Sequence, residues 1–232
     1  SGKSAVLLEL AIWACQTMSV LIVCPTGNLV HQYKSKLPER DGIDNIRVDT
    51  MQGVLNYKRP GADSKVTWSP PSALRRIDLI LFDEGSQYED EPWLRVFQSI
   101  KEQPHAPFSV VVADFQQLQP IGEGGLCQRH CSRMQAVKLK TVYRSSDEDH
   151  LLFLNRIREE QPQKAVLREY FAERHWRHES METCVALGMK LADQAGEPFS
   201  WLSCTNKGAS DVCTAALSVM GISAGDLTSG FL

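Results

Sequence analysis

With 232 residues, the chain is long enough to bury one large hydrophobic core or two smaller ones. Its composition, 43% hydrophobic and 23% charged, is ordinary for a globular protein, and no apolar run approaches the length needed to span a membrane. No signal peptide is visible in the sequence. A net charge of −3 excludes a surface that is basic throughout, but it permits a local basic groove.

The cysteines are odd in number and scattered, which predicts a reducing compartment rather than a disulfide framework. One group, Cys127, His130 and Cys131, has the composition of a metal site. No matching second pair stands nearby, however, and a structural zinc site needs four ligands. The seven cysteines are Cys15, Cys24, Cys127, Cys131, Cys184, Cys204 and Cys213.

The first four residues, Ser-Gly-Lys-Ser, match the second half of a phosphate-binding loop. In such a loop, backbone N–H groups surround the phosphates at the start of a helix, and residues 5–18 are predicted to form that helix. Lys3 would then reach the β- and γ-phosphates, and Ser4 would bind magnesium. The alternative interpretation is a chance Gly-Lys-Ser at the start of a helix. On the first interpretation, the Gly-rich front of the loop is missing from this polypeptide.

Two short predicted strands, 20–24 and 46–49, are followed by polar residues. Thr26 comes after the first strand, and Thr50 and Gln52 come after the second. In proteins that move along nucleic acids, hydroxyls and amides at such strand ends contact phosphates. The same residue types are also common in turns, where they need no function.

Residues 77–82 form an almost uninterrupted apolar run that ends in Asp83 and Glu84, as expected for a buried parallel strand. Open α/β sheets bind their ligands at this carboxyl edge. One carboxylate can hold a magnesium ion while its neighbour orients or deprotonates a water. A second buried strand, 109–113, leads to an acid and then to Gln117, the layout of a sensor whose amide reads a γ-phosphate.

The rest of the chain alternates between predicted helices and strands, which indicates an α/β fold. Residues 57–76, rich in proline, are interpreted as a loop or small insertion. Strands are expected over 137–142 and 199–204, and helices over 28–37, 93–100, 147–160, much of 161–196, and 209–220.

Seven short motifs follow one another in a fixed order, most of them directly after a strand: Gly2-Lys3-Ser4, Pro25-Thr26-Gly27, Asp49-Thr50, Asp83-Glu84-Gly85-Ser86-Gln87, Ala113-Asp114-Phe115-Gln116-Gln117-Leu118-Gln119-Pro120, Tyr143-Arg144 and Cys204-Thr205-Asn206-Lys207. Together they resemble the Pif/RecD-like branch of superfamily-one DNA helicases over nearly the whole chain. The resemblance implies a RecA-like P-loop NTPase fold, a parallel sheet with helices on both faces. It places a first lobe at 1–136, with an insertion around 54–76, and part of a second RecA-like lobe at 137–232.

The resemblance also implies ATPase roles for the matched residues. Glu84 would activate the attacking water, Gln117 would sense the γ-phosphate, and Arg144 would act as an arginine finger from the second lobe. An arginine suits that role because its guanidinium stays charged and bridges two oxygens. The implied nucleotide-binding residues are Gly2, Lys3 and Ser4, and the implied Mg²⁺ ligands are Ser4 and Asp83.

Contacts with the nucleic-acid backbone are implied for Thr26, Thr50 and Gln52, with Thr205 and Asn206 as candidate partners across the cleft. The implied partners are single-stranded DNA or DNA junctions, with movement from 5′ to 3′ in DNA repair or recombination and no membrane association. The expected location is intracellular: nucleus, mitochondrion or bacterial cytoplasm.

Two alternatives stay open: an RNA-directed superfamily-one helicase, and a catalytically incomplete module that binds nucleic acid or a partner without turnover. Intact Asp83, Glu84, Gln117 and Arg144 argue against the second. Because part of the phosphate loop is missing, residues 1–232 by themselves are expected to bind ATP poorly and not to unwind DNA. Measurable ATP-dependent unwinding by this polypeptide would contradict that expectation.

Overall fold

The computed structural model describes residues 2–39, 43–55, 74, 76–117, 120, 124–139, 147–160, 163–173, 180–196, 203 and 205–222. The chain forms two compact units, Ser1–Arg158 and Glu159–Leu232. Residues 137–139 are not in a strand, and the rest of the strand predicted at 137–142 lies outside the described residues. The strand predicted at 199–204 also lies outside them, apart from Ser203.

Within the described part of the first unit, four parallel strands form one sheet in the order β2-β1-β3-β4. The register aligns Cys24 with Thr50 and Val23 with Phe82, so the carboxyl ends of these strands share one edge. All four strands predicted in this part of the sequence are therefore confirmed. Their bounds are β1 Val20–Cys24, β2 Ile46–Thr50, β3 Leu79–Phe82 and β4 Phe108–Val111.

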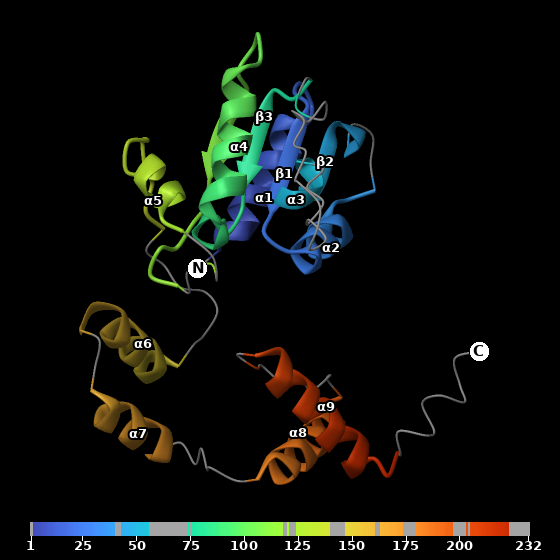
Figure 1. The fold of residues 1–232 in the computed structure, drawn as a ribbon, viewed down its shortest axis with the longest axis vertical. Coiled ribbons are helices and arrows are strands. Elements are labelled where there is room, and N and C mark those ends of the chain that lie inside the picture. The colour runs from blue at the N-terminus through green and yellow to red at the C-terminus, as the bar shows by residue number, and fades with distance from the viewer. Residues whose placement is uncertain are drawn as a thin grey trace, which may run out of the picture. The chain divides into compact units, whose positions relative to one another are not determined.

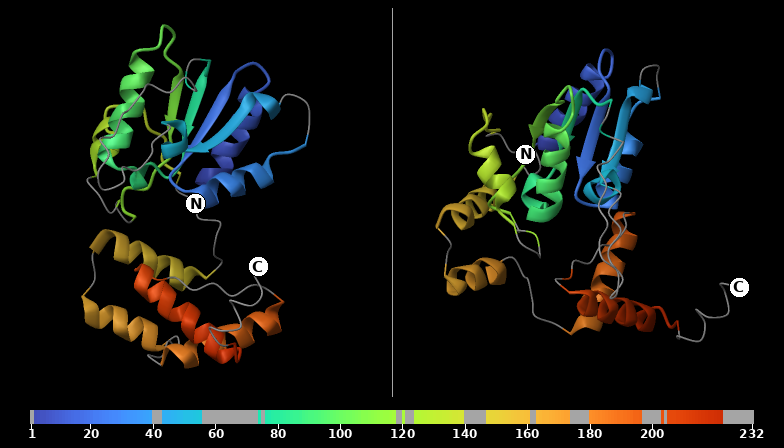
Figure 2. Two further views of the ribbon diagram at one scale, coloured as in Figure 1. Left: turned by 45° about the vertical axis from the view of Figure 1, so that its right-hand side comes forward. Right: turned by 45° about the horizontal axis from the view of Figure 1, so that its top comes forward.

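Helices cover both faces of this sheet, as Figures 1 and 2 show for α1 and α4, which lie on opposite sides. Alternate strand residues point to opposite faces, so β1 contributes Leu21 and Val23 to one buried cluster and Val20 and Ile22 to the other. The helices on the first face are α3 Met51–Val54, α4 Asp90–Lys101 and α5 Leu126–Cys131, and those on the second are α1 Lys3–Ala14 and α2 Gly27–Lys36.

An aromatic cluster forms the centre of the first face. The ring of Trp93, fully buried on α4, lies 5.0 Å from that of Phe82 and 4.7 Å from that of Phe97. The indole Nε1–H of Trp93 donates a hydrogen bond to Nδ1 of His130 on α5 (3.1 Å). This bond links α5 to α4. Helix α5 also contacts η3 (Gly85–Gln87), the short 3₁₀ helix that follows β3.

The second unit is helical in its described residues. Its helices α8 (Met181–Ala195) and α9 (Asn206–Val219) pack against each other through buried Val185, Val212 and Ala215. Helix α7 spans Lys164–Glu173, and α6 (Glu148–Glu160) crosses the boundary between the two units. None of the helices in the described residues combines the length and apolar character needed to cross a membrane.

Candidate functional site

Asp83 follows β3 and is fully buried at the carboxyl edge of the sheet. Its Oδ2 accepts hydrogen bonds from the hydroxyls of Ser4 (3.0 Å) and Tyr33 (2.6 Å), and its Oδ1 accepts from the backbone N–H of Glu84 (2.9 Å). A buried carboxylate is stable only when donors surround it, and these donors come from α1, α2 and the chain after β3. Residues distant in the sequence are thereby joined at Asp83.

The spacing of Ser4 and Asp83 suits a magnesium ion. Hydroxyl and carboxylate oxygens are the hard ligands that Mg²⁺ prefers. Two neighbouring oxygens around an octahedral Mg²⁺ are separated by about 2.9 Å, and Ser4 Oγ and Asp83 Oδ2 are 3.0 Å apart. The two predicted ligands therefore fit a shared ion.

Glu84 stands in a strained turn directly after Asp83. Its backbone is left-handed, with φ 48° and ψ 47°, and it is the only non-glycine residue with positive φ in the part of the chain that the structure describes. This conformation costs roughly 1–2 kcal/mol for a residue with a Cβ. It ends the strand and begins η3, so the two predicted acids lie at the point where the chain turns away from the sheet.

Asp114, three residues after β4, lies among several donors and cations. Its Oδ2 accepts from the Gln117 side-chain amide (3.2 Å), lies 3.8 Å from the Lys3 ammonium, and pairs with Arg158 of α6. Partial burial raises the pKa of Asp114, but the Gln116 N–H, the two cations and the Gln117 amide outweigh burial and hold that pKa below its ordinary value. The sequence motif assigned a role to Gln117 but none to Asp114 itself, and it did not indicate the contact with Arg158.

Burial keeps the neighbouring thiol and phenol protonated. It raises the pKa of Cys24, the last residue of β1, to about 12, and the carboxylates of Asp83 and Asp49 add to this effect. Burial likewise raises the pKa of Tyr33, together with the hydrogen bond that its hydroxyl donates to Asp83. Tyr33 is thus fixed as a donor to Asp83. The sequence did not predict this role for Tyr33. Its only signal is the helical spacing of Tyr33 from Leu29 and Val30, which indicates that its side chain faces the sheet but not that it reaches Asp83.

Three threonines predicted to contact nucleic acid serve as helix N-caps. Thr26 Oγ1 accepts from Leu29 N at the start of α2 (3.4 Å), and Thr50 Oγ1 accepts from Gly53 N at the start of α3 (3.0 Å). Thr205 caps α9 in the same way. Each threonine thus holds a helix N-terminus, where backbone N–H groups are available to anions. Thr26 comes two residues after β1 and Thr50 is the last residue of the neighbouring β2, so both lie at the same sheet edge as Asp83.

The remaining residues that the sequence predicted for the site are Gly2, Gln52, Asn206 and Arg144. Gly2 precedes α1 in a left-handed conformation (φ 68°), and Gln52 is exposed on α3. Asn206 is the first residue of α9, in the second unit. Arg144 lies outside the described residues.

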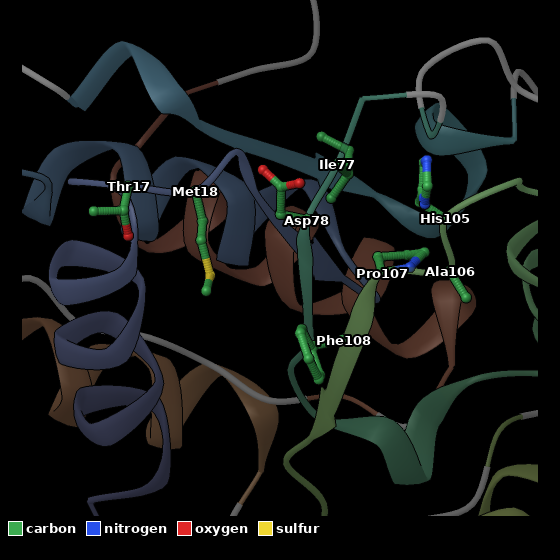
Figure 3. A pocket seen from close by; sticks show the side chains of 8 residues that line it. All are labelled: Thr17, Met18, Ile77, Asp78, His105, Ala106, Pro107 and Phe108. Atoms are coloured by element: carbon green, nitrogen blue, oxygen red, sulfur yellow. The ribbon is translucent and has the colours of Figure 1, made fainter.

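A hollow of about 400 Å³ lies at the opposite edge of the sheet, where the strands begin (Figure 3). Its lining includes Asp78, His105 and Phe108. The Asp78 carboxylate accepts a hydrogen bond from Ser19 N (2.8 Å), which links the residues that precede β3 and β1. The hollow is remote from Asp83, which stands at the other end of β3, and the candidate site is therefore the carboxyl edge.

The parallel sheet, the helices on both faces and the acids at the carboxyl edge define the RecA-like P-loop type of fold, which confirms the predicted fold class. A family described as "AAA domain" matches residues 1–180, and the chain belongs to this family. None of the curated proteins compared with the chain matches it.

Two solved structures are similar to this chain at low sequence identity. One, described as two coordinating Pif1 helicases that unwind forked double-stranded DNA, has a TM-score of 0.50 and 14% identity over 71% of this chain. Another, Bacteroides Pif1 bound to single-stranded DNA, has a TM-score of 0.49 and 15% identity, also over 71% of this chain. The matches cover 43% and 42% of those two proteins, so the chain corresponds to less than half of their length. The agreement with the resemblance drawn from the motifs concerns the fold.

Proposed function

We propose that the chain is part of the motor core of an ATP-dependent helicase that moves along single-stranded DNA. The main support for this proposal is that Ser4 contacts Asp83 and that Lys3 contacts Asp114. These contacts bring the partial phosphate loop to the acids that follow β3 and β4. The match to the AAA family and the fold shared with helicases of known structure support the same function.

In this proposal, Gly2, Lys3 and Ser4 bind the phosphates of ATP. The ammonium of Lys3 exchanges its contact with Asp114 for phosphate oxygens, because a triphosphate carries more negative charge than one carboxylate. Ser4 and Asp83 would hold Mg²⁺, and the bound ion would neutralise part of the negative charge on the phosphates of ATP. Their 3.0 Å spacing supports this assignment.

Glu84 is the proposed residue that activates the attacking water. Its left-handed turn gives it a backbone direction different from that of Asp83, although the two are adjacent. Two neighbouring carboxylates can therefore take different tasks, one on the ion and one on the water. Gln117 is the proposed γ-phosphate sensor, and its exposed hydrogen bond to Asp114, which also lies near Lys3, supports this role.

Arg144 is the proposed arginine finger, on the evidence of its motif alone. It would stabilise negative charge on the transferred phosphoryl group. The proposed lobes are residues 1–136 and 137–232, and closure of a cleft between them would couple hydrolysis to stepping. The proposed direction is 5′ to 3′, on single strands or junctions during repair or recombination, in a nucleus, mitochondrion or bacterial cytoplasm.

The proposed nucleic-acid contacts are Thr26, Thr50 and Gln52, together with Thr205 and Asn206. The capped N-termini of α2, α3 and α9 support this assignment, because each combines a hydroxyl with the backbone N–H groups of a first helical turn. Such contacts hold the sugar–phosphate backbone and carry no sequence preference.

The proposal is tested by measuring DNA-stimulated ATP hydrolysis in a protein that extends this chain at both ends with the residues that its own gene encodes. Glu84→Gln preserves side-chain size while removing the charge that activates water, so we expect turnover to fall by at least about 100-fold, the lower end of the usual contribution of a general base. ATP binding should persist. Ser35→Ala, on the exposed face of α2, is the matched control and should not change turnover.

Absence of turnover in the extended wild type would overturn the proposal and leave a binding module without catalysis. Stimulation by RNA but not by a DNA strand of the same sequence would replace it with an RNA-directed motor. Unchanged turnover in the Glu84→Gln variant would show that Glu84 does not activate the water, although the proposal that the protein is an ATPase would stand.

A further inference from the structure

Cys127 and Cys131 form a close pair of thiols on α5. Their sulfur atoms are 4.0 Å apart, because positions separated by four residues lie one above the other on a helix. Cys127 is 2% exposed, whereas Cys131 is half-buried and within reach of a small solute. A reagent that reacts at Cys131 therefore finds a second thiol directly beside the first.

The buried member of the pair contacts the turn that carries the candidate catalytic acids. A Cβ placed on Gly85 would lie 3.2 Å from Cys127 Sγ and 2.8 Å from Val111 Cγ1. The Gly85 backbone N–H donates to the Val112 carbonyl (2.9 Å), which holds the turn against the end of β4. Any shift of Cys127 thus reaches the residue that follows Glu84.

We propose that Cys127 and Cys131 are an oxidation site, which a peroxide converts to a disulfide and which thereby loosens the turn after Asp83 and Glu84. This site is additional to the proposed ATPase function and does not depend on it. The other cysteines that the structure describes lie elsewhere: Cys15 and Cys24 are buried against the opposite face of the sheet, and Cys184 and Cys213 belong to the second unit.

The reaction has two steps. The Cys131 thiolate attacks one oxygen of the peroxide, the O–O bond breaks, and the departing hydroxide takes a proton to become water. The resulting sulfenic acid is attacked by the Cys127 sulfur, which forms the S–S bond and releases a second water that carries the thiol proton. Two thiols are oxidised by two electrons in total, and one hydrogen peroxide is reduced to two waters.

The order of attack follows from the surroundings of each sulfur. The hydrogen bond from Cys127 lowers the pKa of Cys131, whereas that same bond and burial raise the pKa of Cys127. The thiolate is the nucleophile toward peroxide, so the accessible Cys131 reacts first and Cys127 resolves the sulfenic acid.

Closing the bond requires α5 to deform. Cβ atoms at helical positions four apart are separated by about 5–6 Å, whereas a disulfide needs about 3.5–4.5 Å. Cys131 is the last residue of α5, so its terminal turn is the part that can tighten. The strain is shared with Cys127, which is packed against η3, and the expected result is a weaker Gly85–Val112 hydrogen bond.

Trypsin provides a direct test in the 232-residue chain, because Arg129 lies between the two cysteines. Cleavage places Cys127 in the peptide 102–129 and Cys131 in the peptide 130–133. After treatment of the folded chain with hydrogen peroxide and non-reducing digestion, we expect these two peptides as a linked pair, two hydrogens lighter than their sum. Dithiothreitol should separate them.

Cys127→Ser and Cys131→Ser should each abolish the linked pair, whereas Cys213→Ser, in the second unit, should leave it intact. If wild-type Cys131 instead accumulates as sulfinic acid, or links only to other cysteines, the oxidation site is refuted. Hydrogen exchange tests the coupling: the Gly85 amide should exchange several-fold faster in the oxidised chain. Equal exchange in the oxidised and reduced chains would refute the coupling to the turn.

Discussion

At the scale of single residues, Asp83 shows how the candidate site depends on neighbours that no motif contains. Ser4 belongs to the phosphate-loop motif, but Tyr33 does not, and its hydroxyl makes a shorter hydrogen bond to Oδ2 than Ser4 does. Because Asp83 is fully buried, each donor offsets part of the cost of keeping its carboxylate out of water.

Tyr33→Phe removes one of these donors and leaves the ring in place. We expect the free energy of unfolding to fall by about 1.5–3 kcal/mol, the usual range for a hydrogen bond to a charged group. Urea denaturation at pH 7 measures the change. Ser35→Ala, whose hydroxyl bonds only within α2 at an exposed position, should lie within about 0.5 kcal/mol of wild type. A similarly small effect for Tyr33→Phe would show that Asp83 does not depend on this hydroxyl.

At the scale of elements, the contact between α4 and α5 combines packing with one polar link. Trp93 fills the centre of the aromatic cluster, and its Nε1–H needs an acceptor because it is buried. His130 Nδ1 is that acceptor, which requires this nitrogen to be unprotonated. Burial lowers the pKa of His130, and the positive charges of Arg133, Lys101 and Arg129 lower it further, despite Asp90.

The pairing of Trp93 with His130 predicts a dependence of stability on pH. The pKa of His130 is lower in the folded state than in the unfolded state, so the unfolded state binds more protons below about pH 6.5. The melting temperature should therefore decrease as the pH falls from 7.5 to 5.5. His130→Asn keeps an acceptor near the position of Nδ1 but does not titrate, and its melting temperature should change less. Equal changes in the two proteins would contradict this explanation.

At the scale of the whole molecule, the chain consists of two units with separate hydrophobic cores. The second is the smaller, and its described core is built around Val185, Val212 and Ala215 of α8 and α9. A charge introduced into that core should therefore act locally, because the core of the first unit shares none of these residues.

Val185→Asp tests this independence, since it places an unpaired carboxylate at a fully buried position. We expect amides of α8 and α9 to lose protection from hydrogen exchange, while those of β1 and β3 keep theirs. Leu187→Asp, at an exposed position of α8, is the control and should leave both units protected. Loss of protection throughout the chain would show that the two units unfold together.

The sequence by itself determined the strands of the first unit, the two acids at the end of β3 and the order of the motifs. Those features depend on short-range patterns: buried strands are continuous apolar runs, and ligand-binding residues follow the strand that positions them. Thr26 and Thr50 were interpreted as phosphate contacts or as ordinary turn residues, and the tertiary structure shows that both, like Thr205, cap the helices that follow them.

Only the tertiary structure decided which side chains meet at the carboxyl edge of the sheet. Tyr33 reaches Asp83 across 50 residues, and Lys3 and Arg158 approach Asp114 from opposite directions along the chain. The close approach of Cys127 to Gly85 was likewise absent from any local pattern. Contacts of this kind depend on strand order and helix packing, which hydrophobic periodicity does not specify, because it shows which face of an element is buried but not what covers that face.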